Sequence, residues 1–207
     1  MMLFLCTTCL LLISNVILAQ KSNKTQQELA SQVIRFHVRA NSDETSDQEI
    51  KIKVKNAVIK YLKPIMQNQK NIEAAKTEIL QQLPNVELVV KETLYENDIP
   101  AGSSVQLTKE YFPEKRYGDF VFPRGTYEGV VISIGEGKGQ NWWCMLYPGL
   151  CFVNESYAVV SEEGGEKLEK VLSEDTFAWI SQPERRKCGF RWIDLGKWTF
   201  CPRNIDK

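Results

Sequence analysis

Few side chains in this 207-residue sequence combine the types and spacing that enzyme chemistry requires. The one histidine, His37, alternates with Arg35 and Arg39 on one face of an expected strand, and no second histidine or G-x-S-x-G motif accompanies it. The H-E-x-x-H zinc motif is also missing, and Glu110 and Glu128 are only a weak candidate for a glycosidase-type carboxylate pair. We therefore expect a protein that is not an enzyme, with a solvent-facing or hydrogen-bonded structural His37 and no cofactor.

Four cysteines follow the apolar N-terminus, at positions Cys144, Cys151, Cys188 and Cys201. An even count beyond an export signal favours disulfides, for which three pairings are possible. A zinc site is the alternative, but zinc ligands usually come in C-x2–4-C pairs, closer than the gaps of six and twelve residues found here. We expect no metal site. We expect Cys144–Cys151 to close a turn through Pro148-Gly149, and Cys188–Cys201 to close a C-terminal hairpin.

The most unusual stretch, from Gly135 to Phe152, contains four glycines, two adjacent tryptophans and two cysteines. It is not a P-loop, because Lys138 is followed by glycine instead of Ser or Thr, and no helix follows as a dinucleotide fingerprint requires. A tight hairpin turn after an apolar strand over residues 130–134 accounts for the glycines better. Adjacent strand residues point to opposite faces, so we expect one of the two tryptophans to pack inward and the other to contact a partner.

These features predict a partner-binding surface rather than an active site. The first candidate surface is the glycine-rich run itself, which comprises Gly135, Glu136, Gly137, Lys138, Gly139, Gln140, Asn141, Trp142 and Trp143. We expect this run to stand out from a sheet edge, with its rigidity supplied by the Cys144–Cys151 disulfide behind it. The second candidate surface is the strand face formed by Arg35, His37 and Arg39.

The run GEGKGQNWWC, followed by LCF, resembles the signature of the stage II sporulation protein R family. Further matches cover residues 33–153, at Ile34–Val38 with Ala40–Asp43, at Tyr111–Pro113, at Tyr117-Gly118 and at Pro123–Glu128. The resemblance implies a protein that is secreted from the forespore of endospore-forming Firmicutes into the intermembrane space. There it would activate a membrane-embedded aspartyl protease, leading to processing of the sigma factor E precursor. An exported cell-envelope enzyme that acts on peptidoglycan is the alternative.

The N-terminal segment predicts export. Residues 1–19 are almost wholly apolar or small and uncharged, as in a signal peptide or a membrane anchor, although the basic residues follow the segment instead of preceding it. Residues 20–32 are polar and indicate a flexible spacer, so we expect membrane contact only through the N-terminal segment. The 26 basic and 26 acidic residues balance, which gives no sign of nucleic-acid binding.

The hydrophobic periodicity predicts an α+β fold. A strand over residues 33–40 precedes a helix that begins with a Ser46-x-x-Glu49 capping box and ends or bends at Pro64. Two further helices, over 71–83 and 85–95, are expected on either side of Pro84, and strands follow from residue 105, with 127–134 central in the sheet. We expect a mixed or antiparallel sheet with about three helices on one face, a domain over 33–155, and a tail over 156–207 that combines a linker with the cysteine-closed hairpin.

Overall fold

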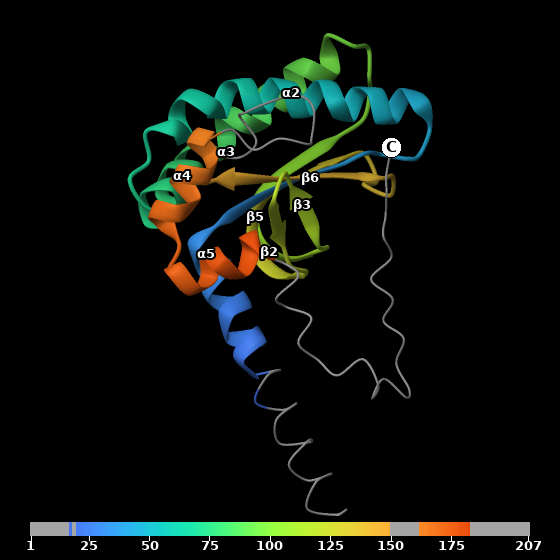
Figure 1. Cartoon of the computed structure of the whole chain (residues 1–207). Coiled ribbons are helices and arrows are strands. Elements are labelled where there is room, and N and C mark those ends of the chain that lie inside the picture. Colours follow the sequence, from blue (N-terminus) through green and yellow to red (C-terminus); the bar gives the residue numbers. More distant parts are fainter. Residues whose placement is uncertain (1–16, 18–19, 150–161, 183–207) are drawn as a thin grey trace, which may run out of the picture.

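The fold is built on a mixed four-stranded sheet, so the α+β class is confirmed. The structure is a computed structural model that describes residues 17, 20–149 and 162–182. The strand order is β2 (Ser103–Phe112), β5 (Gly125–Ile134), β1 (Ile34–Arg39) and β6 (Asn141–Tyr147). Strands β1 and β5 run parallel, and the other two pairs are antiparallel (Figure 1). The apolar segment at 127–134 is central, as its composition predicts.

Two long helices cover one face of the sheet, α2 (Thr45–Gln67) and α3 (Ile72–Tyr95) (Figure 1). Ile34, Phe36 and Val38 point toward them from β1, because alternate residues of a strand share a face. The prediction that Pro84 separates two helices is wrong, since α3 continues through it. Helix α2 likewise continues past Pro64, to Gln67. The buried residues of α3 keep helical spacing on both sides of Pro84, so burying the stripe outweighs the roughly 3 kcal/mol that an interior proline costs.

The predicted capping box at the start of α2 is also wrong. The N-cap residue is Glu44, two residues before Ser46, and it makes no side-chain cap bond. Asp47 in the first turn instead accepts hydrogen bonds from the Asn41 amide, at 2.9 Å, and the Ser42 hydroxyl, at 2.6 Å. The polar turn after β1 is therefore fastened to the start of α2.

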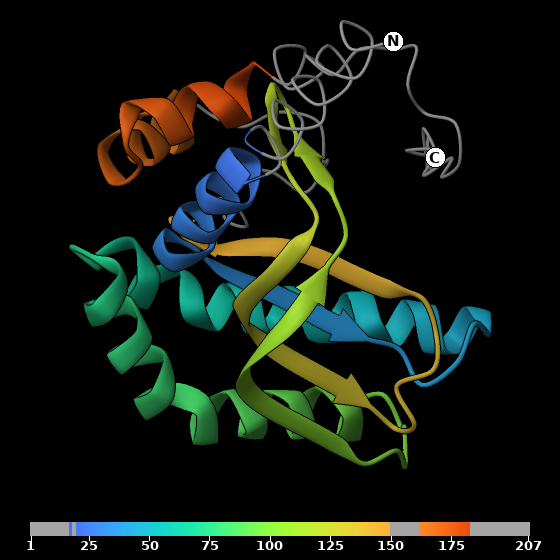
Figure 2. The ribbon, with the colours of Figure 1, turned by 90° about the horizontal axis from the view of Figure 1, so that it is seen from below.

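The other face of the sheet is covered as well, which the sequence did not lead us to expect. A second core gathers under the small hairpin of β3 (Lys115–Tyr117) and β4 (Phe120–Phe122) and under α4 (Glu162–Val171) and α5 (Glu174–Ser181). Residues 20–32, predicted as a spacer, are helical and lie beside α5 (Figure 2). They contribute the fully buried Leu29, and Glu28 accepts a 2.7 Å hydrogen bond from Ser173.

The domain boundaries therefore shift at both ends. Residues 162–181 belong to two helices that pack on the second core, so this part of the predicted linker is wrong. Within residues 17, 20–149 and 162–182, none of the helices has the length and apolar content to cross a membrane. The predicted signal segment at 1–19 lies outside the described residues except for Ile17, and the hairpin of Cys188 and Cys201 lies wholly outside them.

Replacing Leu29 tests whether the helix over residues 20–32 belongs to the folded domain. Leu29→Ala should lower the free energy of unfolding by about 2–4 kcal/mol, because this side chain is fully buried in the second core. The matched change Leu80→Ala, at a leucine that is 51% exposed on α3, should change it by less than about 0.5 kcal/mol. Urea unfolding measures both values, and equal effects would show that the helix does not stabilise the domain.

Candidate functional site

The glycine-rich run forms the connection from β5 to β6, and its backbone is fastened to the turn that follows β1. Main-chain bonds join Lys138 N to Asn41 O at 3.2 Å and Gly139 N to Ala40 O at 3.0 Å. Side chains of the same turn accept two more main-chain N–H groups, from Glu136 to Asn41 Oδ1 at 3.0 Å and from Gln140 to Asp43 Oδ1 at 2.6 Å. The loop is therefore rigid along its length.

The glycines are required by this close contact. A Cβ atom on Gly139 would lie 2.1 Å from the carbonyl oxygen of Ser42, and one on Gly135 would lie 2.1 Å from Asn41 Oδ1. Gly135 also has a φ of +56°, in the left-handed region where a side chain is strained. A turn does follow β5, where Gly137 N donates to Ile134 O at 3.1 Å, but the predicted hairpin is wrong, because β1 lies between β5 and β6 and pairs with both. The loop does not stand free of the sheet, however, because its backbone is hydrogen-bonded to residues 40–43, and a contribution of Cys144–Cys151 to its rigidity stays a prediction.

Asn41 and Asp43 hold the backbone of the candidate loop, a role that the sequence reasoning missed. They hold loop residues that are 95 and 97 positions away in the chain. The sequence does mark them as turn residues that end the first strand. Because β5 runs parallel to β1, the C-terminal ends of both strands lie at the same end of the sheet, which brings this turn beside the loop. The missing information was the strand pairing.

The polar side chains of the loop remain available at the surface. Lys138 and Glu136 form a 2.6 Å ion pair with side chains that are 77% and 68% exposed. Gln140 is exposed, while its carbonyl oxygen accepts a 3.1 Å bond from Lys51 on α2. Asn141 is exposed at the start of β6. The loop therefore presents charged and polar groups on a fixed backbone.

The two tryptophans pack on opposite faces of the sheet. Trp142 is 9% exposed in the first core, in edge-on contact with Phe36 and under the ammonium group of Lys55. Trp143 is partly buried in the second core and stacks on His37, with ring centroids 3.8 Å apart. One tryptophan, Trp142, packs inward as expected, whereas contact of the partly buried Trp143 with a partner stays a prediction. The partner-binding role of the loop remains a prediction.

The Arg35, His37 and Arg39 face is an interior surface. Arg35 is fully buried and His37 is 1% exposed, so only Arg39 reaches solvent, and the second candidate surface is corrected accordingly. His37 Nδ1 lies 3.3 Å from Glu110 Oε2, and Arg39 donates a short hydrogen bond to Glu110 Oε1. The expectation of a hydrogen-bonded structural histidine is confirmed.

The environment of His37 favours its neutral form. Burial is the main cause that lowers the pKa of His37 from 6.5 to about 4, and the positive charge of Arg39 lowers it further. Hydrogen bonding of the imidazole to the side chains of Asn141 and Glu110, and the charge of Glu110, act in the opposite direction without restoring the ordinary value. A buried neutral imidazole between Trp143 and Glu110 has a packing role, and no nucleophile contacts it among the described residues.

Comparisons with known proteins identify the family of this chain. The chain matches the model of a family described as stage II sporulation protein R over residues 30–157. It is also 37% identical over 164 residues to the stage II sporulation protein R of Bacillus subtilis (strain 168). The aligned region covers 76% of this chain and 73% of that protein. The chain belongs to the stage II sporulation protein R family. No solved structure matches it.

In this member of the stage II sporulation protein R family, the strand pairing does not support Glu110 and Glu128 as a glycosidase-type carboxylate pair. In the pairing of β2 and β5, Glu128 lies opposite Lys109, and Glu110 lies opposite Tyr127. Glu110 and Glu128 therefore point to opposite faces of the sheet, where Glu128 pairs with Lys76 at 2.8 Å. They cannot act on one glycosidic bond, which requires two carboxylates that face each other.

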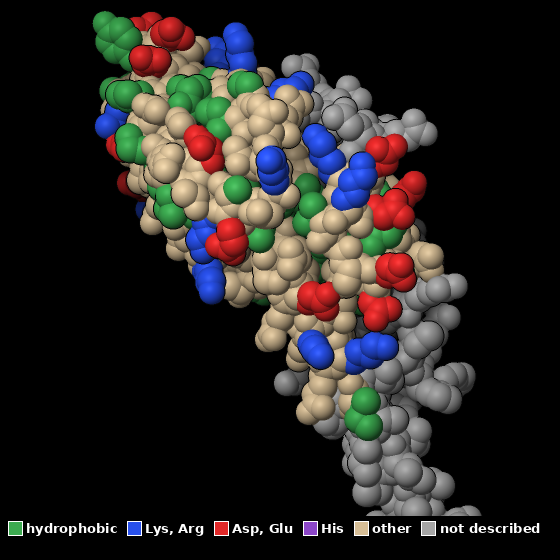
Figure 3. All heavy atoms as spheres, turned by 90° about the vertical axis from the view of Figure 1, so that its left-hand side faces the viewer, with side chains coloured by type: hydrophobic (Ala, Val, Ile, Leu, Met, Phe, Trp, Pro, Cys, Tyr) green, Lys and Arg blue, Asp and Glu red, His purple; other side chains and the backbone are tan. Residues whose placement is uncertain are grey.

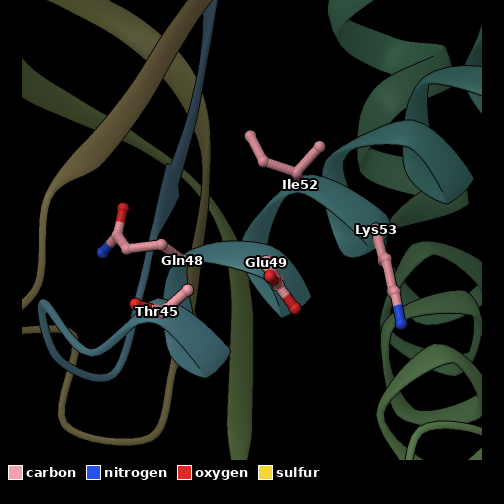
Figure 4. A pocket seen from close by; sticks show the side chains of 5 residues that line it. All are labelled: Thr45, Gln48, Glu49, Ile52 and Lys53. Carbon is pink, nitrogen blue, oxygen red and sulfur yellow. The ribbon is translucent and has the colours of Figure 1, made fainter.

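Other potential sites in the described part of the family member are sparse. A hollow beside α2 is lined by five residues of this one helix, Thr45, Gln48, Glu49, Ile52 and Lys53 (Figure 4). Across residues 17, 20–149 and 162–182, no group of three or more His, Cys, Asp or Glu side chains could hold a metal ion. Cys144 is buried, whereas Cys151, Cys188 and Cys201 lie outside the described residues, so both disulfide pairings stay predictions.

Gly139→Ala tests the contact between the loop and the turn after β1. The added methyl group would collide with the carbonyl oxygen of Ser42, so we expect a loss of about 1–3 kcal/mol in the free energy of unfolding. Gly102→Ala is the matched control, because no atom lies within 4 Å of its added Cβ. If Gly139→Ala unfolds at the same denaturant concentration as the control, the loop does not depend on this contact.

The lowered pKa of His37 predicts a loss of stability in acid. The unfolded chain binds a proton near pH 6.5 and the folded chain near pH 4, so stability is fully present above pH 6.5 and falls as the pH drops toward 4. The loss attributable to this group should reach about 3 kcal/mol, in addition to the effects of carboxylates. Unfolding of the wild type and of His37→Gln between pH 7 and 4 measures the difference.

Nuclear magnetic resonance provides the direct check, because His37 is the only histidine in the sequence. Its imidazole signal should titrate well below the ordinary value of 6.5. Titration near 6.5 would show that the imidazole is solvated in the folded protein.

Proposed function

We propose that this chain is an exported messenger of sporulation that activates a membrane-embedded aspartyl protease, which leads to processing of the sigma factor E precursor. Membership of the stage II sporulation protein R family supports a role in sporulation. The observation that carries the binding step is the loop between β5 and β6, whose backbone is fixed while its polar side chains are exposed. A surface that is already ordered loses little conformational entropy when a partner binds it.

The position of the loop supports direct contact with a protein. It leads into β6, which is an edge strand of the sheet, and Trp142 anchors the start of this strand from the inside. Charges of both signs lie side by side in the loop, in Glu136 and Lys138. Acidic and basic side chains are likewise interspersed on the face of the described residues shown in Figure 3. Such a surface fits a partner with complementary charges of both signs, which favours specificity.

The proposal includes export from the forespore into the intermembrane space through residues 1–19, with or without cleavage near Ala19. Contact with the membrane would be limited to that segment. In this oxidising compartment Cys144 would pair with Cys151, and Cys188 with Cys201. Labelling of free thiols in the exported protein before and after reduction checks the pairing, and four free thiols would contradict it.

Loop variants test the binding step in a membrane system that contains the full chain, the candidate protease and the sigma factor precursor. Lys138→Ala combined with Gln140→Ala should lower processing about tenfold or more, as expected for loss of central interface contacts. The melting temperature should stay nearly unchanged, because both side chains are exposed.

The matched control is Lys63→Ala combined with Gln67→Ala, at exposed positions near the far end of α2. This control should process the precursor at the wild-type rate. If the loop variant also does so while folded, the contact surface lies elsewhere. If the wild type itself fails to stimulate processing, the chain does not activate this protease.

A further inference from the structure

The guanidinium group of Arg35 lies inside a cage of four aromatic rings. Its Cζ atom is 4.9 Å from the ring centroid of Phe112, 5.1 Å from that of Tyr127, and 5.9 Å from those of both Tyr117 and Phe122. The side chain is fully buried. Such contacts attract a cation to the faces of the rings, but they offer no oxygen acceptors for its N–H groups.

This cage contains hydrogen-bond donors without acceptors. Nε, Nη1 and Nη2 of Arg35 have no hydrogen-bond partner within the part of the chain that the structure describes, and the buried hydroxyl of Tyr117 has none either. Burial raises the pKa of Tyr117, so this hydroxyl keeps its proton, while the nearby charge of Arg35 acts in the opposite direction. The carboxylate of Glu110 is already engaged by His37 and Arg39. The cage therefore lacks one negatively charged acceptor.

The walls of the cage belong to two separate sheets. Phe112 and Tyr127 lie on β2 and β5 of the main sheet, whereas Tyr117 and Phe122 lie on the β3–β4 hairpin, which forms a two-stranded sheet of its own. The hairpin projects beyond the main sheet (Figure 2) and contacts α5 through Phe120 and Phe177, with ring centroids 5.6 Å apart. Movement of the hairpin would uncover Arg35 without breaking any strand pair of the main sheet.

We propose that Arg35 and Tyr117 form the receptor for a carboxylate of the protein partner, and that the β3–β4 hairpin closes this receptor in the free protein. The planar guanidinium group binds a carboxylate through two parallel hydrogen bonds, and the hydroxyl of Tyr117 supplies a third donor. Removal of water by the aromatic walls strengthens this interaction. A singly charged carboxylate balances the one buried cation, whereas a doubly charged phosphate would leave an excess negative charge.

In this proposal Arg35 binds the carboxylate of the partner, and its unpaired charge lowers the folding stability of the free protein. An unpaired buried charge destabilises a fold, and an apolar side chain of similar size in its place is often neutral or stabilising. If Arg35 were instead paired with a carboxylate elsewhere in this chain, its removal would leave that carboxylate buried alone and would destabilise the protein strongly. The sign of the change in stability therefore separates the two arrangements.

The test compares the full-length wild type with Arg35→Met, Tyr117→Phe and the matched control Arg116→Met, at an exposed arginine on the same hairpin. Melting temperatures are measured as sodium acetate replaces sodium chloride at constant ionic strength. Acetate should raise the melting temperature of the wild type and of Arg116→Met, and it should have a smaller effect on Tyr117→Phe and none on Arg35→Met. In chloride alone, Arg35→Met should melt no lower than the wild type.

The same proteins are then compared in the processing assay, because the identity of the partner rests on the proposed function. Arg35→Met should stimulate processing at least about tenfold less than the wild type, as for loss of a central interface contact, and Arg116→Met should be unchanged. The proposal is overturned if Arg35→Met melts several degrees below the wild type, if it stimulates processing normally, or if acetate has no effect that depends on Arg35. A wild type that stimulates no processing would count against the proposed function, and the acetate measurement alone would then decide on the carboxylate receptor.

Discussion

The pairing of β1 with both β5 and β6 determines the environment of almost every residue discussed above. Because β1 is in the interior of the sheet and both sheet faces are covered, each of its side chains except that of Arg39 is buried on one of the two faces. The apolar residues Ile34, Phe36 and Val38 meet α2 and α3. Arg35 and His37 enter the second core, where a polar group is stable only if it finds a partner or loses its charge.

The same pairing fixes the loop from β5 to β6. Since β1 and β5 are parallel and β6 is antiparallel, the end of β1 lies at the edge of the sheet where the chain crosses from β5 to β6. The turn after β1 can therefore hold the loop, with Asn41 bonded both to the loop and to Asp47 at the start of α2. One asparagine thus couples the loop to α2, so the exposed side chains of Glu136 and Lys138 are carried on a backbone that is hydrogen-bonded to the rest of the fold.

Periodicity predicted the strands and the class of the fold, because alternation along β1 and the apolar run of β5 are local properties of the sequence. It failed where a local rule competed with burial. Pro84 satisfies a rule for helix ends, yet the buried stripe of α3 continues across it. Residues 20–32 are polar enough for a spacer, but Leu29 finds a pocket between elements that are distant in sequence. The neighbours of the loop depend on strand order, which no local pattern contains, and so the site was predicted only as a run of residues.

The two buried basic side chains of β1 show why only one of them points to a ligand. A histidine can lose its proton, and His37 does so when burial lowers its pKa to about 4, which leaves a neutral ring that Trp143 and Glu110 can accommodate. An arginine cannot lose its proton in a protein, so Arg35 keeps its charge in a core where its N–H groups have no hydrogen-bond acceptor among the described residues. The second core thus holds His37 as a neutral ring, whereas at Arg35 the aromatic rings compensate the charge only in part. A carboxylate from outside the cage would complete this core, which makes binding of a partner and burial of the charge the same event.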